Sequence, residues 1–391
     1  MKKIFVLANT HWPLAGTSGG EAVLKNIFIK VADRANVTFF THSCYKDYLS
    51  EEIKSAEYRL TTKLYDIFTI LPSYIFRTLN AVIYLLFNNR YDVFYTASDF
   101  FPDVIPAFFF KKGHNKWIQS IFHLYSHYSI RKGNILINGA GYYLQRLSLY
   151  LIKQRADLII VDNRMLKEEL HSMGFDKRKI IVSPAGINID HLQKVPAISG
   201  YTCTFLGRLH PTKGIFDLVE IWKIVCSNFP DAKIAFIGRG QEEIKAELIE
   251  RINDAGLQNN IDLLGFLPSH EAFGFIKSSS VFLFPSHEEG WGIAIADAMA
   301  CQVPVITWDL PVFDDVFENY IIKISENNID QFADTVIDLL KNNSKRKNIA
   351  KSGFRFIQKY NSNKIAEDMM KVILSESPLA NAEHLSSLED T

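Results

Sequence analysis

The sequence has little cysteine, and its cysteines are not clustered. The chain of 391 residues contains four of them, Cys44, Cys203, Cys226 and Cys301, and no two form a Cys-x-x-Cys pair. Structural zinc sites and dithiol redox motifs need such clusters, so neither is predicted. We interpret each thiol as a small apolar side chain of a protein in a reducing compartment.

Long apolar runs are also missing. The most apolar stretch, residues 67–87, is interrupted by Pro72, Arg77 and Asn80, which leaves pieces shorter than the ~20 residues that a membrane-spanning helix needs. The first residues, MKKIFVLAN, have too few apolar side chains for the core of a signal peptide. A cytoplasmic chain without a spanning helix is therefore predicted.

Net charge is absent overall but not locally. The chain has 43 Lys and Arg against 43 Asp and Glu. Residues 1–190 contain 24 basic and 16 acidic residues and residues 191–391 contain 19 and 27, so the halves carry +8 and −8. Either the halves attract each other, or the basic half faces an anionic membrane surface or acceptor. No nucleic-acid partner is expected.

Short apolar segments alternate with amphipathic ones throughout the chain, which is typical of parallel α/β domains. The length and the hydrophobic content of 48% favour two folded domains. We expect strands at 3–8, 37–41, 93–96, 117–122, 158–161, 180–183, 202–207, 233–238, 261–265, 281–285 and 305–307, and helices that include 21–35, 215–228, 241–255 and 365–374. The predicted fold class is two doubly wound, Rossmann-like domains facing each other across a cleft.

The turn-rich segment QKVPAISG, residues 193–200, is the predicted joint between the domains. It divides the chain into a first domain of residues 1–195 and a second of residues 196–375, whose last helix is expected to pack back on the first. Residues 376–391 are polar and lack aromatic side chains, which predicts a disordered tail. Ligands of open α/β sheets bind at the carboxyl ends of the strands, so the site is expected between the domains.

Three strand ends of the second domain carry glycine. In FLGRLHPTKG, residues 205–214, a strand ends at Gly207, and Arg208 and Lys213 follow in the loop before a helix. Two cations beside a helix N-terminus suit a diphosphate, although a solvated loop would also account for them. The turns FIGRGQ and LLGFLP are weaker signals of the same kind.

A fourth segment, SHEEGWGIAIADAMACQVPVIT at residues 286–307, sets Glu289 and Asp297 into an otherwise apolar run. Gly290 and Gly292 free the backbone before a helix that is predicted to begin near Ile293, and the unpaired N–H groups of that helix could bind a phosphate or sugar oxygen. Burying a carboxylate without a partner is costly, so Asp297 should meet a ligand. The alternative is that it only complements the helix dipole.

Together these motifs resemble the retaining glycosyltransferases of family 4, which have the GT-B fold. The resemblance rests on G-R-L…K-G, the G-x-G turn and E-G-W-G followed by D-A-M-A-C-x-x-P-V, and it extends through HWPLAGTSGGEAVL and WIQSIFHLYS in the first half. In the family, seven residues separate this glutamate from a second one, at the position where this chain has Asp297. The shorter acid leaves the strength of donor binding open.

The resemblance implies roles for individual residues. Arg208 and Lys213 would neutralise the leaving diphosphate, Glu289 would contact the transferred sugar, Asp297 would accept from the ribose hydroxyls, and His123 would lie beside the sugar. The catalytic set is therefore His123, Glu289, Arg208 and Lys213. The implied donor-binding set is Gly19, Gly20, Gly207, Gly238, Gly240, Gly290, Trp291, Gly292, Ile293 and Asp297. No metal and no cofactor is expected, because the sequence has no Asp-x-Asp motif in the donor segments.

The predicted function is metal-independent, retaining transfer of a sugar from a UDP- or GDP-sugar to a glycan or lipid-linked acceptor, in cell-surface polysaccharide or glycolipid synthesis. Two alternatives stay open: a nucleotide-sugar-binding protein that has lost transfer, and a nucleotide-sugar epimerase on the same fold. The basic first half also contains aromatic stretches at 65–87 and 100–110, with Lys111, Lys112 and Lys116 beside the second. These features favour a peripheral position at the inner face of a membrane, unless the aromatic side chains are ordinary core.

Overall fold

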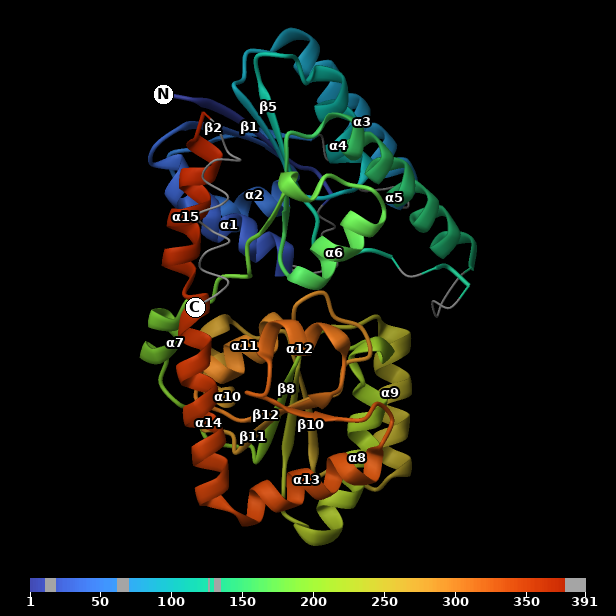
Figure 1. The fold of residues 1–391 in the computed structure, drawn as a ribbon. Coiled ribbons are helices and arrows are strands. Elements are labelled where there is room, and N and C mark those ends of the chain that lie inside the picture. The colour runs from blue at the N-terminus through green and yellow to red at the C-terminus, as the bar shows by residue number, and fades with distance from the viewer. Residues whose placement is uncertain (11–18, 62–69, 126, 130–134, 377–391) are drawn as a thin grey trace. The chain divides into compact units, whose positions relative to one another are not determined.

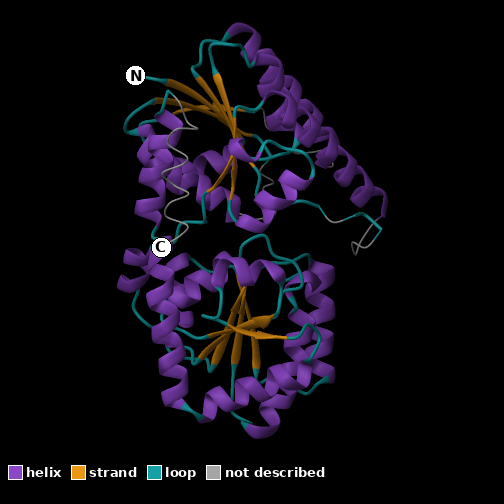
Figure 2. Ribbon diagram, viewed as in Figure 1, coloured by secondary structure: helices purple, strands orange, loops and turns teal. Residues whose placement is uncertain are grey.

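The computed structural model describes residues 1–10, 19–61, 70–125, 127–129 and 135–376 (Figure 1). Residues 377–391 of the expected tail, and residues 11–18 of the first glycine loop, therefore lie outside the described residues. The chain divides into two compact units, Met1–Gly186 with the residues from Asn363 onward, and Ile187–Ser362. Each unit is an α/β unit with helices on a parallel sheet (Figure 2), which confirms the prediction of two doubly wound, Rossmann-like domains.

The first unit contains a sheet of seven parallel strands in the order β3-β2-β1-β4-β5-β6-β7. All but the edge strand β3 are largely buried on both faces, because β-branched and aromatic side chains fill them, as is typical of parallel sheets. The strands are β1 (Lys3–Ala8), β2 (Asn36–Thr41), β3 (Glu57–Leu60), β4 (Val93–Thr96), β5 (Lys116–Ser120), β6 (Leu158–Val161) and β7 (Ile180–Val182). Its helices are α1 (Gly19–Ala32), α2 (Ser43–Ser50), α3 (Ile70–Phe87), α4 (Phe101–Phe110), α5 (Ile135–Arg155), α6 (Arg164–Ser172) and α15 (Ser362–Leu374).

The second unit contains six parallel strands in the order β10-β9-β8-β11-β12-β13. The strands are β8 (Cys203–Leu206), β9 (Ile234–Ile237), β10 (Ile261–Gly265), β11 (Val281–Phe284), β12 (Val305–Trp308) and β13 (Ile322–Ile324). The helices are α7 (Ile189–Lys194), α8 (Ile215–Asn228), α9 (Glu242–Asp254), α10 (Ser269–Ser278), α11 (Ile293–Ala300), α12 (Pro311–Phe317), α13 (Ile329–Lys341) and α14 (Asn343–Ile357). Short 3₁₀ turns occupy Lys177–Lys179, Pro211–Lys213 and Gln358–Tyr360.

The division into units differs from the sequence-based boundary at residue 195. Ile187 exchanges main-chain hydrogen bonds with the end of the second unit, because its N–H donates to Tyr360 O at 2.8 Å and its carbonyl accepts from Ser362 N at 2.9 Å. The Lys277 ammonium donates to the carbonyls of Leu192, Gln193 and Val195. These contacts tie α7 and the segment after it to the second unit. Part of the predicted joint is therefore helix.

Candidate functional site

Two loops of the second unit leave its sheet where the strand order reverses. β8 and β11 are neighbours in the sheet, β9 and β10 lie on one side of them, and β12 and β13 lie on the other. Ligands of doubly wound sheets bind at the carboxyl ends of the two strands at such a reversal. The loops at that position are residues 207–214 after β8 and residues 285–292 after β11, which are the two strongest sequence motifs.

These two loops are joined by their main chains. The His287 N–H donates to Thr212 O at 2.8 Å, and the Ser286 hydroxyl donates to the same carbonyl at 3.1 Å. Gly214 has a φ of +69°, and a Cβ at this position would lie 1.9 Å from Pro285 O. Only glycine combines that left-handed conformation with so close an approach. The two loops therefore hold each other in place.

The side chains of Lys213 and Glu289 form an ion pair across these loops. The Lys213 ammonium lies 2.5 Å from Glu289 Oε1 and also donates to Glu288 O at 3.0 Å. The two side chains are only 15% and 11% exposed, so the pair is shielded from most of the solvent. The sequence assigned both residues to the site, and the structure shows them in direct contact.

The guanidinium of Arg208 lies on the same loop and has a different environment. Arg208 is exposed, and within the described part of the chain it pairs with no carboxylate. A guanidinium without a carboxylate partner can bind a phosphate through two parallel hydrogen bonds. This loop therefore carries Arg208, which has no carboxylate partner among the residues described, and Lys213, whose charge is neutralised by Glu289.

Glycines allow the loop after β8 to contact the loop after β9. Gly238 has a φ of +145°, and a Cβ on it would lie 1.8 Å from Gly207 O. A Cβ on Gly240 would lie 2.4 Å from Leu209 O, and the Leu209 N–H donates to Arg239 O at 2.8 Å. These glycines therefore have a packing role, whether or not they also contact a ligand.

Helix α11 begins at Ile293, as the sequence predicts. Its N-cap, Gly292, has a φ of +98° and supplies no capping side chain, and the Ile295 N–H donates to Gly292 O at 3.0 Å. The N–H groups that precede Ile295 in the helix are therefore available to an anion. Gly290 lies in the loop just before this turn.

Asp297 lies in the second turn of α11 and has no protein partner. Within the described residues no hydrogen-bond donor and no cation contacts its carboxylate. Burial raises the pKa of Asp297 from its ordinary value of 3.8 to about 7, although part of the residue is reached by solvent. The sequence analysis expected Asp297 to be a carboxylate in apolar surroundings that lacks a partner within the protein, and the described residues show this arrangement.

Trp291, which the resemblance implied as a donor-binding residue, has a buried side chain. Its side chain is 4% exposed and packs edge-on against the rings of Phe317 and Tyr360, at centroid distances of 5.5 and 5.1 Å. The indole is thus part of the core of the second unit. Any contact of Trp291 with a ligand is left to its main chain.

Sequence reasoning missed the residues that anchor the loop after β11. The His287 ring lies 2.9 Å from Asp217 Oδ2 and 2.5 Å from Glu326 Oε1, and Asp217 also accepts from the Trp308 indole at 3.0 Å. Hydrogen bonds to Asp217 and Glu326 raise the pKa of His287 above its ordinary value. The histidine directly before the two glutamates was the available signal, but its partners are distant in the sequence.

In the first unit, His123 lies in the segment after β5. Its ring lies edge-on to Tyr125, with centroids 6.2 Å apart, and Gln145 of α5 donates to its carbonyl at 3.0 Å. At the start of α1, which begins at Gly19, a Cβ on Gly20 would lie 2.9 Å from the ring of Phe122. The structure therefore brings the glycine start of α1 to the segment that holds His123.

A buried polar cluster lies at the same edge of the first sheet, and sequence reasoning did not identify it. Asp103 accepts from the Asn9 N–H at 2.8 Å and from the Ser98 hydroxyl at 2.6 Å. Gln145 donates to Asp99 at 2.7 Å. Burial raises the pKa of Asp99 to about 6 and that of Asp103 to about 7. The Gln145 amide links the segments after β4 and β5.

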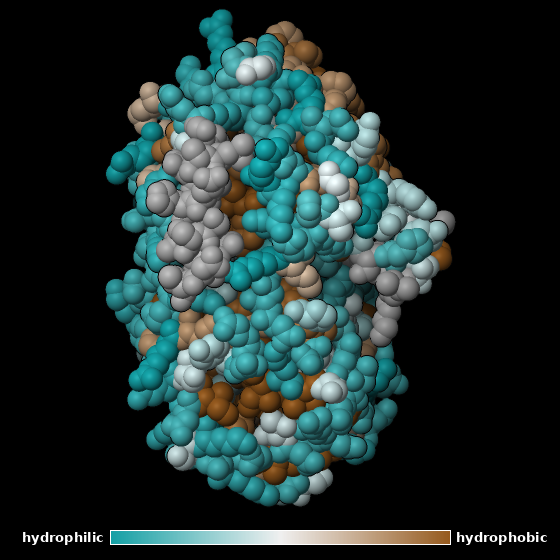
Figure 3. Space-filling model, viewed as in Figure 1, coloured by the Kyte–Doolittle hydropathy of each residue, from teal (hydrophilic) through white to brown (hydrophobic). Residues whose placement is uncertain are grey.

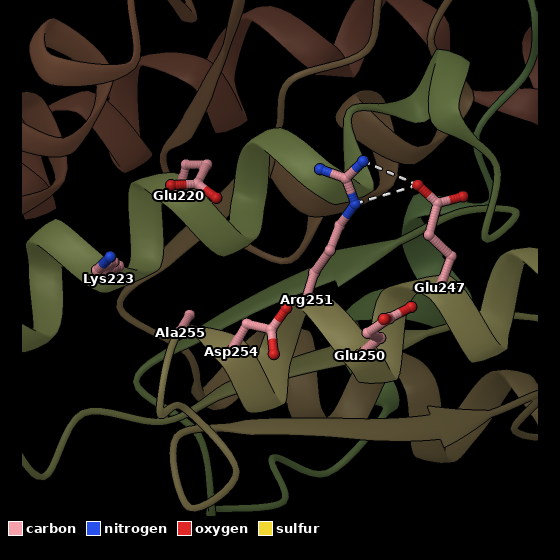
Figure 4. Close-up of a pocket in the computed structure, with 7 residues that line it drawn as sticks. All are labelled: Glu220, Lys223, Glu247, Glu250, Arg251, Asp254 and Ala255. Carbon is pink, nitrogen blue, oxygen red and sulfur yellow. Dashed lines mark hydrogen bonds and ion pairs between the residues drawn. The ribbon is translucent and has the colours of Figure 1, made fainter.

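Neither unit shows a metal centre among the residues described, since no three His, Cys, Asp or Glu side chains are grouped closely enough to hold an ion. One cavity of about 430 Å³ opens between α8 and α9 of the second unit (Figure 4). It is lined by Glu220, Lys223, Glu247, Glu250, Arg251, Asp254 and Ala255. The lining lies toward the carboxyl ends of these helices, which is the sheet edge opposite to the loops described above.

Two family models match the chain. Residues 17–191 match "Glycosyltransferase Family 4" and residues 195–356 match "Glycosyl transferases group 1". A solved structure of Anabaena Alr3699/HepE in complex with UDP-glucose is similar over 99% of this chain and 100% of that one, with a TM-score of 0.74 and 18% identity. At that identity the likeness shows the fold alone.

Curated relatives match mainly one part of the chain. A phosphatidyl-myo-inositol mannosyltransferase of Mycobacterium leprae is 28% identical over 55% of this chain and 58% of its own length. A poly(glycerol-phosphate) alpha-glucosyltransferase of Bacillus subtilis is 27% identical over 41% of this chain and 24% of its own length. The matched region thus spans less than two thirds of either relative. With one model on each unit and the same two-unit fold, the chain belongs to the glycosyltransferases of the family 4 type.

Proposed function

We propose that the protein transfers a sugar, with retention of configuration, from a UDP- or GDP-sugar to a glycan or glycolipid acceptor. The observation that carries the proposal is the cluster of Arg208, Lys213 and Glu289 on the two loops at the strand-order reversal. The partnerless carboxylate of Asp297 follows in the helix after the second loop. The complex of Anabaena Alr3699/HepE with UDP-glucose supports a nucleotide-sugar donor.

The cations would act on the leaving group. The bond between the anomeric carbon and the diphosphate oxygen breaks, and the nucleoside diphosphate leaves with the electron pair. The acceptor hydroxyl oxygen bonds to the same face of that carbon and passes its proton to the departing diphosphate. Arg208 and Lys213 stabilise the charge that develops on the diphosphate, which is the largest contribution expected of side chains in such a step.

The Lys213–Glu289 ion pair sets the geometry of this step. The carboxylate holds the ammonium at the mouth of the two loops before a donor arrives. A bound diphosphate competes for the same ammonium, and Glu289 is then available to accept from a hydroxyl of the transferred sugar. Asp297 accepts from the ribose hydroxyls of the nucleotide, which supplies its missing partner.

In this proposal the reaction needs no metal ion, because Arg208 and Lys213 take the place of one. Two side-chain cations can neutralise a diphosphate that other enzymes bind through a divalent ion. The four free thiols fit a reducing, cytoplasmic location. The first unit, with His123 at its sheet edge, is the proposed acceptor side.

The test is nucleoside diphosphate release from a panel of UDP- and GDP-sugars, with and without a lysate glycan fraction and with excess EDTA. We expect acceptor-dependent release from one donor, unchanged by EDTA. Arg208→Ala should lower kcat/KM by about two to three orders of magnitude, the usual scale for one such contact. Lys233→Ala is the matched control, because this exposed lysine precedes β9 at the opposite sheet edge.

Each alternative result has a distinct meaning. Nucleotide binding without release under any acceptor condition would indicate a binding protein. Conversion of the donor to another nucleotide sugar without an acceptor would indicate an epimerase. Loss of activity in EDTA would refute metal independence, and equal activities of Arg208→Ala and Lys233→Ala would remove Arg208 from the site.

A further inference from the structure

Helix α3 exposes a continuous apolar stripe. Large apolar side chains point outward at nearly every turn, from Leu71 with 44% of its surface exposed to Phe87 with 83%. The exposed set on this helix is Leu71, Ile75, Phe76, Leu79, Ile83, Leu86 and Phe87. The opposite face packs Arg77, Ala81 and Leu85 into the unit. A contiguous apolar surface of this length is unusual for a face in contact with water.

The stripe extends over the neighbouring helices. α4 packs against both α3 and α5 (Figure 1), and it exposes Phe109 near its end. Helix α5 exposes Tyr143, Leu147 and Tyr150 on one face, each at least half exposed. Figure 3 shows apolar side chains along the upper right edge, over the position of α3 in Figure 1. We call the outward residues of α3 and α5, with Phe109, the apolar face.

Charge is distributed unusually around the apolar face. The described residues of α3, α4 and α5 include one acidic side chain, Asp103, and it is fully buried. Exposed cations lie at or just beyond the carboxyl ends of the three helices, namely Arg90, Lys112 and Lys153. Because these helices follow parallel strands, their carboxyl ends lie at one edge of the sheet. The cations therefore form a rim along one side of the apolar face.

Two carboxylates at this sheet edge do not cancel the three cations. Asp157 pairs with Lys111 at 3.1 Å. Asp92 accepts from the neutral Lys3 N–H at 2.8 Å, so it keeps its charge and offsets only one of the three. Of the two aromatic stretches singled out in the sequence, the first includes α3 and the second is α4 with the residue before it. Most of residues 100–110 is core, Lys111 is ion-paired, and Lys116 donates to Ser375 O. The exposed apolar residues lie on α3, within the first stretch, on α5, which the sequence did not single out, and at Phe109.

We propose that the apolar face is the surface by which this protein docks on an anionic lipid bilayer. Aliphatic side chains would enter the boundary of the acyl chains, and the rings of Tyr143, Tyr150 and Phe87 suit the headgroup level, where aromatic residues concentrate. The cationic rim complements anionic headgroups. A second copy of the chain would instead present a rim of the same net sign.

The test is co-sedimentation of the purified protein with neutral vesicles of phosphatidylcholine and with vesicles that also contain phosphatidylglycerol. We expect binding to the anionic vesicles at low salt and its loss at high salt, because the rim interaction is screened. Ile83→Glu should weaken this binding roughly tenfold or more by placing a charge in the apolar face. Ile249→Glu is the matched control, an exposed isoleucine on α9 of the second unit.

The readout needs no turnover, so it fails or succeeds independently of the proposed reaction. Both variants are at exposed helix positions, and equal thermal unfolding would show that neither has lost its fold. The proposal is overturned by protein that stays in the supernatant with anionic vesicles at low salt, or by equal binding of the two variants. Sedimentation equilibrium showing a dimer that Ile83→Glu dissociates would assign the face to a second copy.

Discussion

Replacing Asp297 with asparagine should make the protein more stable and bind nucleotide more weakly at the same time. The carboxylate lies in the second turn of α11, and within the described residues it has neither a donor nor a cation as a partner. Asparagine has nearly the same shape and no charge. The substitution therefore removes the cost of burying the charge and also removes a charged acceptor for a ribose hydroxyl.

The size of the stability effect follows from the pKa. Burial raises the pKa of Asp297 from 3.8 to about 7, so the folded protein retains a proton that the unfolded chain releases. Stability should therefore fall as pH rises from about 4 to about 7 and then stay constant. The full shift corresponds to about 4 kcal/mol. Because the residue is partly exposed, we expect about 2–4 kcal/mol to be recovered by Asp297→Asn at about pH 8.

The assay is thermal unfolding of the parent and the Asp297→Asn protein at about pH 5 and about pH 8, without and with UDP or GDP. Unfolding temperatures of units of this size change by about 2–4 °C for each kcal/mol. The variant should therefore unfold several degrees higher at the upper pH, with a smaller gain at the lower pH. Nucleotide affinity should fall by ~1.5–3 kcal/mol, and Asp297→Glu should retain it.

A helix-dipole role predicts the opposite result. If Asp297 only complements the dipole of α11, Asp297→Asn should destabilise the protein by about 0.3–1 kcal/mol and leave nucleotide binding unchanged. Either of these outcomes would refute the reasoning above. Asp231→Asn is a suitable control, because that aspartate is exposed in the loop before β9.

Two further predictions concern the loops at the strand-order reversal. Lys213→Met should lower kcat/KM by about two to three orders of magnitude. Glu289→Gln frees the Lys213 ammonium without removing it, so this variant should retain the apparent affinity for nucleoside diphosphate. Tighter nucleotide binding by Lys213→Met in a titration would contradict the proposed role of Lys213. Gly214→Ala should destabilise the second unit by about 2 kcal/mol or more, because its Cβ would overlap the Pro285 carbonyl and its φ is positive. Gly113→Ala, with no atom near its Cβ, should leave the unfolding temperature nearly unchanged, and equal effects of the two alanines in a melt would show that the loops adjust.

The sequence predicted the local features of the site. The alternation of apolar strands with helices identified both parallel sheets, and the glycines after β8, β9 and β11 marked the places where the chain turns. The start of α11 at Ile293 follows from Gly292, which can adopt the left-handed conformation before the helix and has no side chain to cap the next N–H groups. Asp297 was recognisable because a lone carboxylate in an apolar helix breaks the pattern. These are short-range properties, which composition and periodicity determine.

Only the tertiary structure decided which of these residues meet. The contact of Lys213 with Glu289 joins loops from two strands that are neighbours only because the sheet order reverses between them. Packing against Phe317 and Tyr360, which are distant in the sequence, encloses the Trp291 ring in the core. Likewise, α4 is buried and α3 is exposed, although both read as apolar. Periodicity shows that a face is apolar, but what covers that face depends on helix packing between residues far apart in the chain.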